Sequence, residues 1–247
     1  MELNEYEHKS PVEVLGRAGS AVDQGLRSYM IRVFNYMWMS LLITGATAYL
    51  FANTGLLSLL YNIDMQNKTI SMSALGWIVT FAPFALILAF GYVVRNKSMT
   101  AVHTVFWLFS VLFGASMASI FFAYTVGSIT RVFLITAGTF GAMSLYGYTT
   151  KRDLSNIGSF LMMGVLGIII ASIVNIWLKS PGLYYAISYI SVLAFTGLTA
   201  YDIQNIKNIY YHDASDHSRS AVMGALSLYL DFINLFMALL RIMGDRR

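Results

Sequence analysis

Two acidic residues stand in stretches of sequence that otherwise have the composition of membrane-spanning helices. Asp202 follows the apolar run 186–200, and Asp231 lies inside the run 220–240. An ionised carboxylate in hydrocarbon is costly, so such an acid usually faces the protein interior or a wet cavity and has a partner. The simplest arrangement brings the two carboxyl groups together. Asp202 and Asp231 are therefore the residues of this chain best suited to chemistry.

Two carboxyl groups that meet inside a membrane can share a proton. Like-charge repulsion and desolvation both disfavour the doubly ionised state, so the pair would titrate as one coupled unit. A shared proton would tie the two segments together, and its loss would push them apart, as in a pH-operated latch. When ionised, Asp202 and Asp231 could also attract a hard cation such as calcium, which prefers oxygen ligands. Asn205 and Asn234 each follow an acid by three residues, which predicts an amide neighbour on the same helix face.

Two other interpretations of the acids stay open. Each aspartate could be a structural residue that is bonded to amides and hydroxyls and never titrates. The pair could also belong to an intramembrane aspartyl protease, which needs two membrane aspartates that share a proton. The presenilin-like form of that enzyme has a Tyr-Asp motif and a Gly-x-Gly-Asp motif. Tyr201-Asp202 matches the first, but Asp231 stands in the string Leu-Tyr-Leu-Asp, without the glycines of the second motif, so the sequence favours a protein that is not an enzyme.

The composition of the chain is that of a membrane protein. Of its 247 residues, 57% are hydrophobic and 11% are charged, whereas soluble domains carry about 25% charged residues. The chain has no cysteine, which excludes disulfides and thiolate chemistry. The net charge of +4 comes from basic residues in loops and at helix ends, where positive charge sets membrane topology. We therefore expect a lipid bilayer, and no nucleic acid, as the partner of this surface.

Seven apolar segments have about the 20 residues that a helix needs to cross a bilayer. They are 33–51, 74–94, 101–124, 132–148, 157–178, 183–203 and 221–240. We expect an all-α polytopic membrane domain over residues 29–247. A polar, mostly flexible cytoplasmic tail is expected at residues 1–28, with a short helix near residues 22–32. In the third segment Ser110, Gly114 and Ala118 recur every four residues, which predicts the close approach of a neighbouring helix.

Lysines and arginines are distributed unevenly between the two ends of these segments. The tail and the joints after the second, fourth and sixth segments carry ten of them. The opposite side carries six when the C-terminal arginines are included. Since cytoplasmic loops are enriched in basic residues, this bias predicts a cytoplasmic N-terminus. Arg241, Arg246 and Arg247 oppose a full crossing by the last segment.

Several longer motifs resemble the bacterial branch of the Bax inhibitor-1 (transmembrane Bax inhibitor motif) family. They are RVFNYM at 32–37, ITG at 43–45, SLYGYTTKRDLS at 144–155, TAYDIQ at 199–204 and LYLDFINLF at 228–236. The similarity runs in the right order from about residue 27 to the C-terminus. Together these motifs are specific, although each one alone would not be.

The resemblance implies a seven-helix fold in which six helices wrap a central C-terminal helix. It also implies a pH-sensitive calcium leak in the bacterial inner membrane, with calcium as the permeant ion and no cofactor. A hydrogen-bonded aspartate pair, which maps onto Asp202 and Asp231, would govern that leak. Some bacterial relatives are instead linked to a membrane-bound AAA protease that they modulate. The alternative function is therefore a non-conducting regulator of such a protease or of membrane-protein quality control.

Two features depart from the family pattern. The segment 74–94 contains no arginine or acid, although a calcium-leaking relative would place a basic residue near the pore there. The joint 207–220 is long and contains His212, Asp213, Asp216 and His217. These four residues could bind a metal or form a solvated loop.

Overall fold

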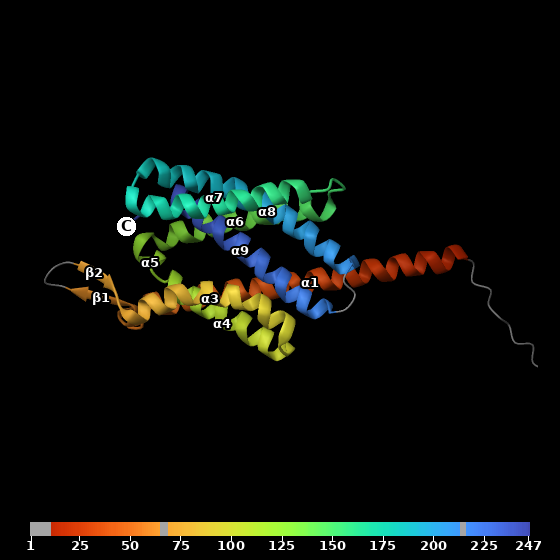
Figure 1. The fold of residues 1–247 in the computed structure, drawn as a ribbon, viewed down its shortest axis with the longest axis horizontal. Helices are drawn as coiled ribbons and strands as arrows, with labels where there is room; N and C mark the ends of the chain where they lie inside the picture. The colour runs from red at the N-terminus through yellow and green to blue at the C-terminus, as the bar shows by residue number, and fades with distance from the viewer. Residues whose placement is uncertain (1–10, 65–68, 213–215) are drawn as a thin grey trace, which may run out of the picture.

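The structure is a computed structural model that describes residues 11–64, 69–212 and 216–247. Its long helices pack side by side, and a small hairpin projects from one end (Figure 1). Two antiparallel strands, β1 (Tyr61–Asp64) and β2 (Thr69–Met72), form this hairpin. The helices are α1 (Pro11–Asn53), α2 (Leu57–Leu60), α3 (Ala74–Asn96), α4 (Met99–Met117), α5 (Ile120–Ala123), α6 (Val126–Thr149), α7 (Ser155–Leu178), α8 (Pro181–His212) and α9 (His217–Met243).

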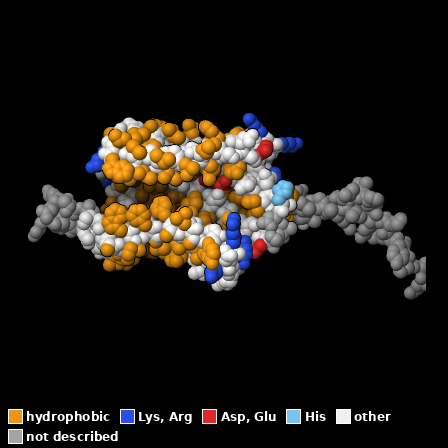
Figure 2. Space-filling model, in the orientation of Figure 1, with side chains coloured by type: hydrophobic (Ala, Val, Ile, Leu, Met, Phe, Trp, Pro, Cys, Tyr) orange, Lys and Arg blue, Asp and Glu red, His pale blue; other side chains and the backbone are white. Residues whose placement is uncertain are grey.

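Six helical spans in the described part of the chain are long and apolar enough to cross a membrane. They are α3, the continuous stretch of α4 and α5, α6, α7, α8 and α9, and they coincide with the second to seventh predicted segments. Their outer surfaces are hydrophobic: Leu88 is 84% exposed and Trp177 is 76% exposed. Figure 2 shows such side chains covering one face of the bundle. Because contiguous apolar surface of this extent requires lipid, the chain is an all-α polytopic membrane protein.

The first predicted segment, 33–51, lies inside α1, which is not among those six spans. The helix begins at Pro11, so the backbone is helical through residues for which the sequence predicted a mostly flexible tail. Proline is well tolerated in this first position because its missing N–H would have no helical partner there. Among the α1 side chains whose burial the structure describes, from Gln24 on, buried ones include Leu26, Val33 and Met37. The face of α1 that packs into the core thus includes a residue before the expected domain boundary at residue 28. The division into a tail, 1–28, and a membrane domain, 29–247, stays a prediction.

Helix α9 is the most buried of the candidate spans. In its most apolar window 67% of the residues are buried, against 6–44% in the other five. It packs against α1, α4, α6 and α8, while α3 packs on α4 and α7 packs on α8. Two groups of helices, α1–α3–α4 and α6–α7–α8, therefore lie on either side of α9 (Figure 1).

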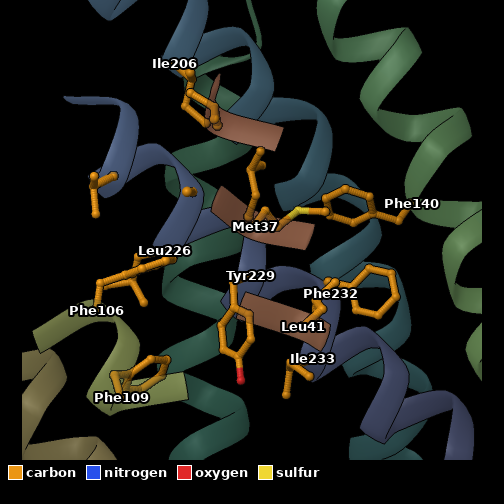
Figure 3. Close-up of a cluster of buried hydrophobic side chains, with 14 of the residues drawn as sticks. Met37, Leu41, Phe106, Phe109, Phe140, Ile206, Leu226, Tyr229, Phe232 and Ile233 are labelled. Atoms are coloured by element: carbon orange, nitrogen blue, oxygen red, sulfur yellow. The ribbon is translucent and has the colours of Figure 1, made fainter. Parts of the chain in front are cut away.

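The core around α9 is aromatic and aliphatic. The ring of Tyr229 lies 5.5 Å from that of Phe109, and the ring of Phe232 lies 5.4 Å from that of Phe140 (Figure 3). Both pairs meet edge to face, the geometry that the ring quadrupoles favour. These contacts join α9 to α4 on one side and to α6 on the other.

A small buried polar network joins α1, α4 and α9. The hydroxyl of Thr44 donates to the carbonyl of Ser110 at 3.0 Å and lies 2.9 Å from the hydroxyl of Tyr229. Since Thr44 has one proton, Tyr229 is the donor in the second bond. Gly114 allows this approach, because a Cβ there would lie 2.5 Å from the carbonyl oxygen of Thr44. Ser110, Gly114 and Ala118 are all buried, which confirms the predicted small-residue contact.

The loops between the helices lie at the two ends of the bundle, and an arginine forms contacts at each end. Arg219, at the start of α9, donates to the carbonyl of Lys97 at 2.8 Å, between α3 and α4. At the other end Arg131 forms a 2.8 Å ion pair with Asp245, beyond the end of α9. The 27 residues of α9 extend roughly 40 Å, which is enough for a full crossing despite the C-terminal arginines. Two of the counted lysines, Lys9 and Lys68, lie outside the described residues.

Candidate functional site: a carboxyl pair between two helices

The sequence places Asp231 in the middle of a helix whose start is well defined. Asp216 caps α9: its Oδ1 accepts from the N–H groups of Ser218 and Arg219, both at 3.2 Å, which satisfies two donors that lack helical partners. Asp231 lies fifteen residues further on, roughly 22 Å along the axis. Ser227 precedes it by four residues and so occupies the same helix face.

The structure brings the two predicted acids together across the α8–α9 contact. The hydroxyl of Ser227 donates to Oδ2 of Asp202, and the carboxyl groups of Asp202 and Asp231 lie within hydrogen-bonding reach of each other. Asp231 is 5% exposed, and Asp202 is half-buried. No N–H or O–H group of the described residues donates to Oδ2 of Asp231. Because two carboxylates in contact repel each other, the arrangement is suited to hold one proton between them.

Close glycine contacts fix the part of α8 that precedes Asp202. A Cβ at Gly147 of α6 would lie 2.3 Å from the carbonyl oxygen of Ala200, and a Cβ at Gly158 of α7 would lie 2.3 Å from the ring of Tyr201. Both distances are too short for a real Cβ contact. Helices α6 and α7 can therefore approach α8 this closely only because these positions are glycine, as is common in membrane bundles.

Gln204 holds α8 just after Asp202, and the sequence analysis assigned it no role. Its Oε1 accepts from the backbone N–H of Leu154 at 2.8 Å, and its Nε2 donates to the carbonyl of Arg152 at 2.9 Å. The joint between α6 and α7 is thereby fastened to α8. The position of Gln204 inside the TAYDIQ motif is the only sequence signal that could have pointed to it.

The structure does not bring Asn205 and Asn234 to the acids. Both side chains are exposed, and the amide of Asn234 donates to the carbonyl of Leu230 in its own helix at 2.8 Å. Within the described ranges, neither amide has a hydrogen bond to Asp202 or Asp231.

Two carboxyl groups and one hydroxyl are a small set of oxygen ligands. Calcium takes 6–8 oxygens, so Asp202 and Asp231 could contact a passing ion but would leave most of its shell to water. Among residues 11–64, 69–212 and 216–247 there is no group of three or more His, Cys, Asp or Glu side chains placed to hold a metal.

The predicted long joint 207–220 is wrong in its extent, because α8 runs to His212 and α9 begins at His217. Several of its polar residues have structural contacts. Asp216 caps α9 and accepts from Nε of Arg219 at 2.7 Å. The N–H groups and guanidinium of Arg219 hold the pKa of this carboxyl below its usual range. The ring of His217 stacks on that of Tyr210 with 4.7 Å between centroids. Asp213 lies outside the described residues.

In Figure 2, acidic atoms are visible in the middle of the hydrophobic face, beside a furrow between two rows of apolar side chains. Acidic side chains are exceptional on a surface that faces lipid. Asp202 and Asp231 are the acids that the candidate spans contain. The same two positions fall inside motifs that can be compared with other proteins.

The comparisons with known proteins agree on one family. The model of the family described as "Inhibitor of apoptosis-promoting Bax1" matches residues 26–247. The inner membrane protein YbhL of Escherichia coli is 45% identical over 228 residues, which cover 90% of this chain and 94% of that protein. An uncharacterized protein of Caulobacter vibrioides is 43% identical over 234 residues, 94% of each chain. One from Rickettsia prowazekii is 42% identical over 227 residues, 91% of this chain and 92% of its own. The chain therefore belongs to the Bax inhibitor-1 family of membrane proteins.

Proposed function

We propose that this protein is a pH-sensitive leak channel for calcium or a similar cation in the bacterial inner membrane, and that Asp202 and Asp231 form its gate. The observation that supports this proposal is the meeting of two carboxyl groups between α8 and α9, with Ser227 as the hydroxyl donor to Asp202. As a channel the protein needs neither a catalytic residue nor a cofactor.

The gate works through one proton. While the pair holds it, one carboxyl group donates to the other and ties α8 to α9. Release of the proton to water leaves two negative charges in contact at low dielectric, where their repulsion is strong. The helices then separate, water enters, and the ionised oxygens attract a cation. We therefore expect cation flux to rise as the pH increases through the titration of the pair.

The proposal includes a topology. Helix α1 would be the first of seven spans, with residues 33–51 in the hydrocarbon, and α9 would be the central helix of the bundle. The N-terminus would lie in the cytoplasm, together with the joints near Arg95, Arg152 and Lys207, because basic residues concentrate there. The burial of α9 and the buried α1 residues support this arrangement.

The test is calcium entry into dye-loaded liposomes that contain the purified protein, scanned from acidic to alkaline pH. Asp231→Asn and Asp202→Asn keep the shape of the pair but remove one titrating group each. The step in calcium entry as the pH is raised should therefore disappear in both variants. Asp153→Asn, which changes an exposed acid at the joint after α6, is the matched control and should retain it.

Ser227→Ala provides a finer test of the same gate. Loss of the hydroxyl removes the hydrogen bond to Asp202 and destabilises the ionised form relative to the protonated form. The flux step should therefore move to a higher pH without disappearing. An unchanged step in Asp202→Asn, Asp231→Asn and Ser227→Ala would refute the gate. Absence of flux at every pH would favour the non-conducting regulator, whose membrane-bound protease should then co-purify with it.

A further inference from the structure

A second feature of the molecule lies on its lipid-facing flank, away from the acid pair. A cavity of about 390 Å³ opens between α1 and α4, within the usual size range of small-molecule sites. On α1 its lining runs from Ser28 to Met39, roughly 16 Å along the helix axis. The cavity is therefore elongated along α1, and it starts at the basic end of the bundle.

The lining changes character along this length. At the outer end it has the side chains of Ser28, Arg32 and Asn35, all exposed. Beside and beyond them are Ile31, which is 50% exposed, Met39, which is 51% exposed, and Trp107 of α4. A cationic and polar mouth thus leads to an apolar stretch of the cavity that is partly open at the surface, as a phospholipid headgroup and its acyl chain would require.

Within the described part of the chain, no acidic side chain forms an ion pair with the arginine at the mouth of the cavity. Arg32 donates only a long 3.3 Å hydrogen bond to the hydroxyl of Ser218, and the ion pairs formed among described side chains involve Arg131 and Arg219 instead. A guanidinium at this position can bind a phosphate in the bidentate geometry that arginine favours. Asn35 lines the same cavity, and its amide could donate to that phosphate.

Contacts of Tyr36, which lines the cavity, join the two helices that form it. The hydroxyl of Tyr36 lies 3.0 Å from Nε2 of His103, and its ring lies 6.1 Å from that of Trp107. These contacts join α1 to α4 beside the cavity. A free phosphate would leave the apolar half empty, whereas an acyl chain would fill it.

We propose that this cavity binds one anionic phospholipid, with its phosphate on Arg32 and Asn35 and an acyl chain along Ile31, Met39 and Trp107. Anionic headgroups are commonly bound in basic pockets between membrane helices on the cytoplasmic side. The lipid would fasten α1 to α4 at one membrane interface. This site is independent of the acid pair and does not require that the protein conduct ions.

Fluorescence quenching tests the proposal directly. The full-length protein is reconstituted into phosphatidylcholine vesicles that contain increasing fractions of phosphatidylglycerol brominated on its acyl chains. The signal of Trp107 is the difference between the wild type and Trp107→Phe, because Trp38, Trp77 and Trp177 are exposed to bulk lipid and quench in both. Trp107 should reach half-quenching at a lower fraction of brominated phosphatidylglycerol than of brominated phosphatidylcholine.

The charge at the mouth is tested by Arg32→Gln. Since one basic residue near an anionic surface contributes about 1 kcal/mol, this variant should need roughly fivefold more phosphatidylglycerol for the same quenching. Arg95→Gln changes an exposed arginine at the same end that does not line the cavity and should leave quenching unchanged. Equal quenching by the two lipids, or no change in Arg32→Gln, would overturn the proposal. Recovery of Trp107 fluorescence on adding inorganic phosphate would identify a site for a free anion instead.

Discussion

Two glycines on α6 offer a matched test of how the Asp202 segment is positioned. A Cβ at Gly147 would lie 2.3 Å from the carbonyl oxygen of Ala200, whereas a Cβ at Gly141 would have nothing within 4 Å. Gly147→Ala and Gly141→Ala add the same methyl group to the same helix. Only the first pushes on α8, two residues before Asp202.

The expected difference between these variants follows from the geometry. For an ordinary contact of at least 3.4 Å, the methyl group at residue 147 must move away from Ala200 by about 1.1 Å. Overpacking of this kind costs about 1–3 kcal/mol. The gain in helix propensity from glycine to alanine, about 1 kcal/mol, applies to both variants and cancels in the comparison. Gly147→Ala should therefore be about 1–3 kcal/mol less stable than Gly141→Ala.

Thermal unfolding of the detergent-solubilised protein measures this difference. For a chain of this length the difference corresponds to roughly 2–12 °C in Tm. In liposomes Gly147→Ala should also alter the pH step of calcium entry, because it displaces the backbone next to Asp202, while Gly141→Ala should not. Equal Tm values and identical pH profiles for the two variants would show that the close approach of α6 to α8 does not position the acid.

Two further substitutions probe the network around α9 and its cap. Tyr229→Phe should cost about 0.5–1.5 kcal/mol, because one buried hydrogen bond is lost while Thr44 keeps its other bond. Thr44→Val should cost more, about 1–3 kcal/mol, since it leaves the buried hydroxyl of Tyr229 without its acceptor; equal Tm losses would contradict this. Asp216→Ala should cost about 1 kcal/mol at neutral pH through loss of the cap. The lowered pKa of Asp216 means that this contribution is complete above about pH 3.9 and disappears as the pH falls through the lowered value. The Tm values of the wild type and of Asp216→Ala should then converge in strong acid. A Tm difference that does not change with pH would show that the negative charge of Asp216 does not contribute to stability.

The spans could be predicted from the sequence because a bilayer leaves few choices. Backbone groups in hydrocarbon must bond within the segment, so a long apolar run has to be helical. The predicted segment 157–178 is realised as α7 (Ser155–Leu178) and the segment 74–94 as α3 (Ala74–Asn96). The hairpin of β1 and β2 was not predicted. Its strands, YNID and TISM, do alternate apolar and polar residues, but two runs of four residues in a polar joint are too short for the pattern to stand out.

The pairing of Asp202 and Asp231 could be inferred from the cost of burying a lone charge, but its surroundings could not. Helical spacing suggested Asn205 and Asn234 as neighbours, whereas the donor found in the structure is Ser227, one turn before Asp231. The spacing of residues in the sequence shows which of them share a face of one helix. It does not show which residues of a neighbouring helix contact that face. For the same reason Gly147 and Gly141 look equivalent in the sequence, although only one of them touches α8.

The acid pair and the tyrosine network act on opposite faces of α9. Ser227 and Asp231 face α8, while Tyr229 lies roughly 200° around the helix from Ser227 and bonds to Thr44 of α1. Close glycine contacts hold α8 to α6 and α7, so a change of charge at the pair acts where this three-helix group meets α9. The bond of Tyr229 keeps α9 with α1 and α4 at the same time. In the proposed channel, loss of the shared proton would therefore separate two groups of helices, and would not move one helix alone.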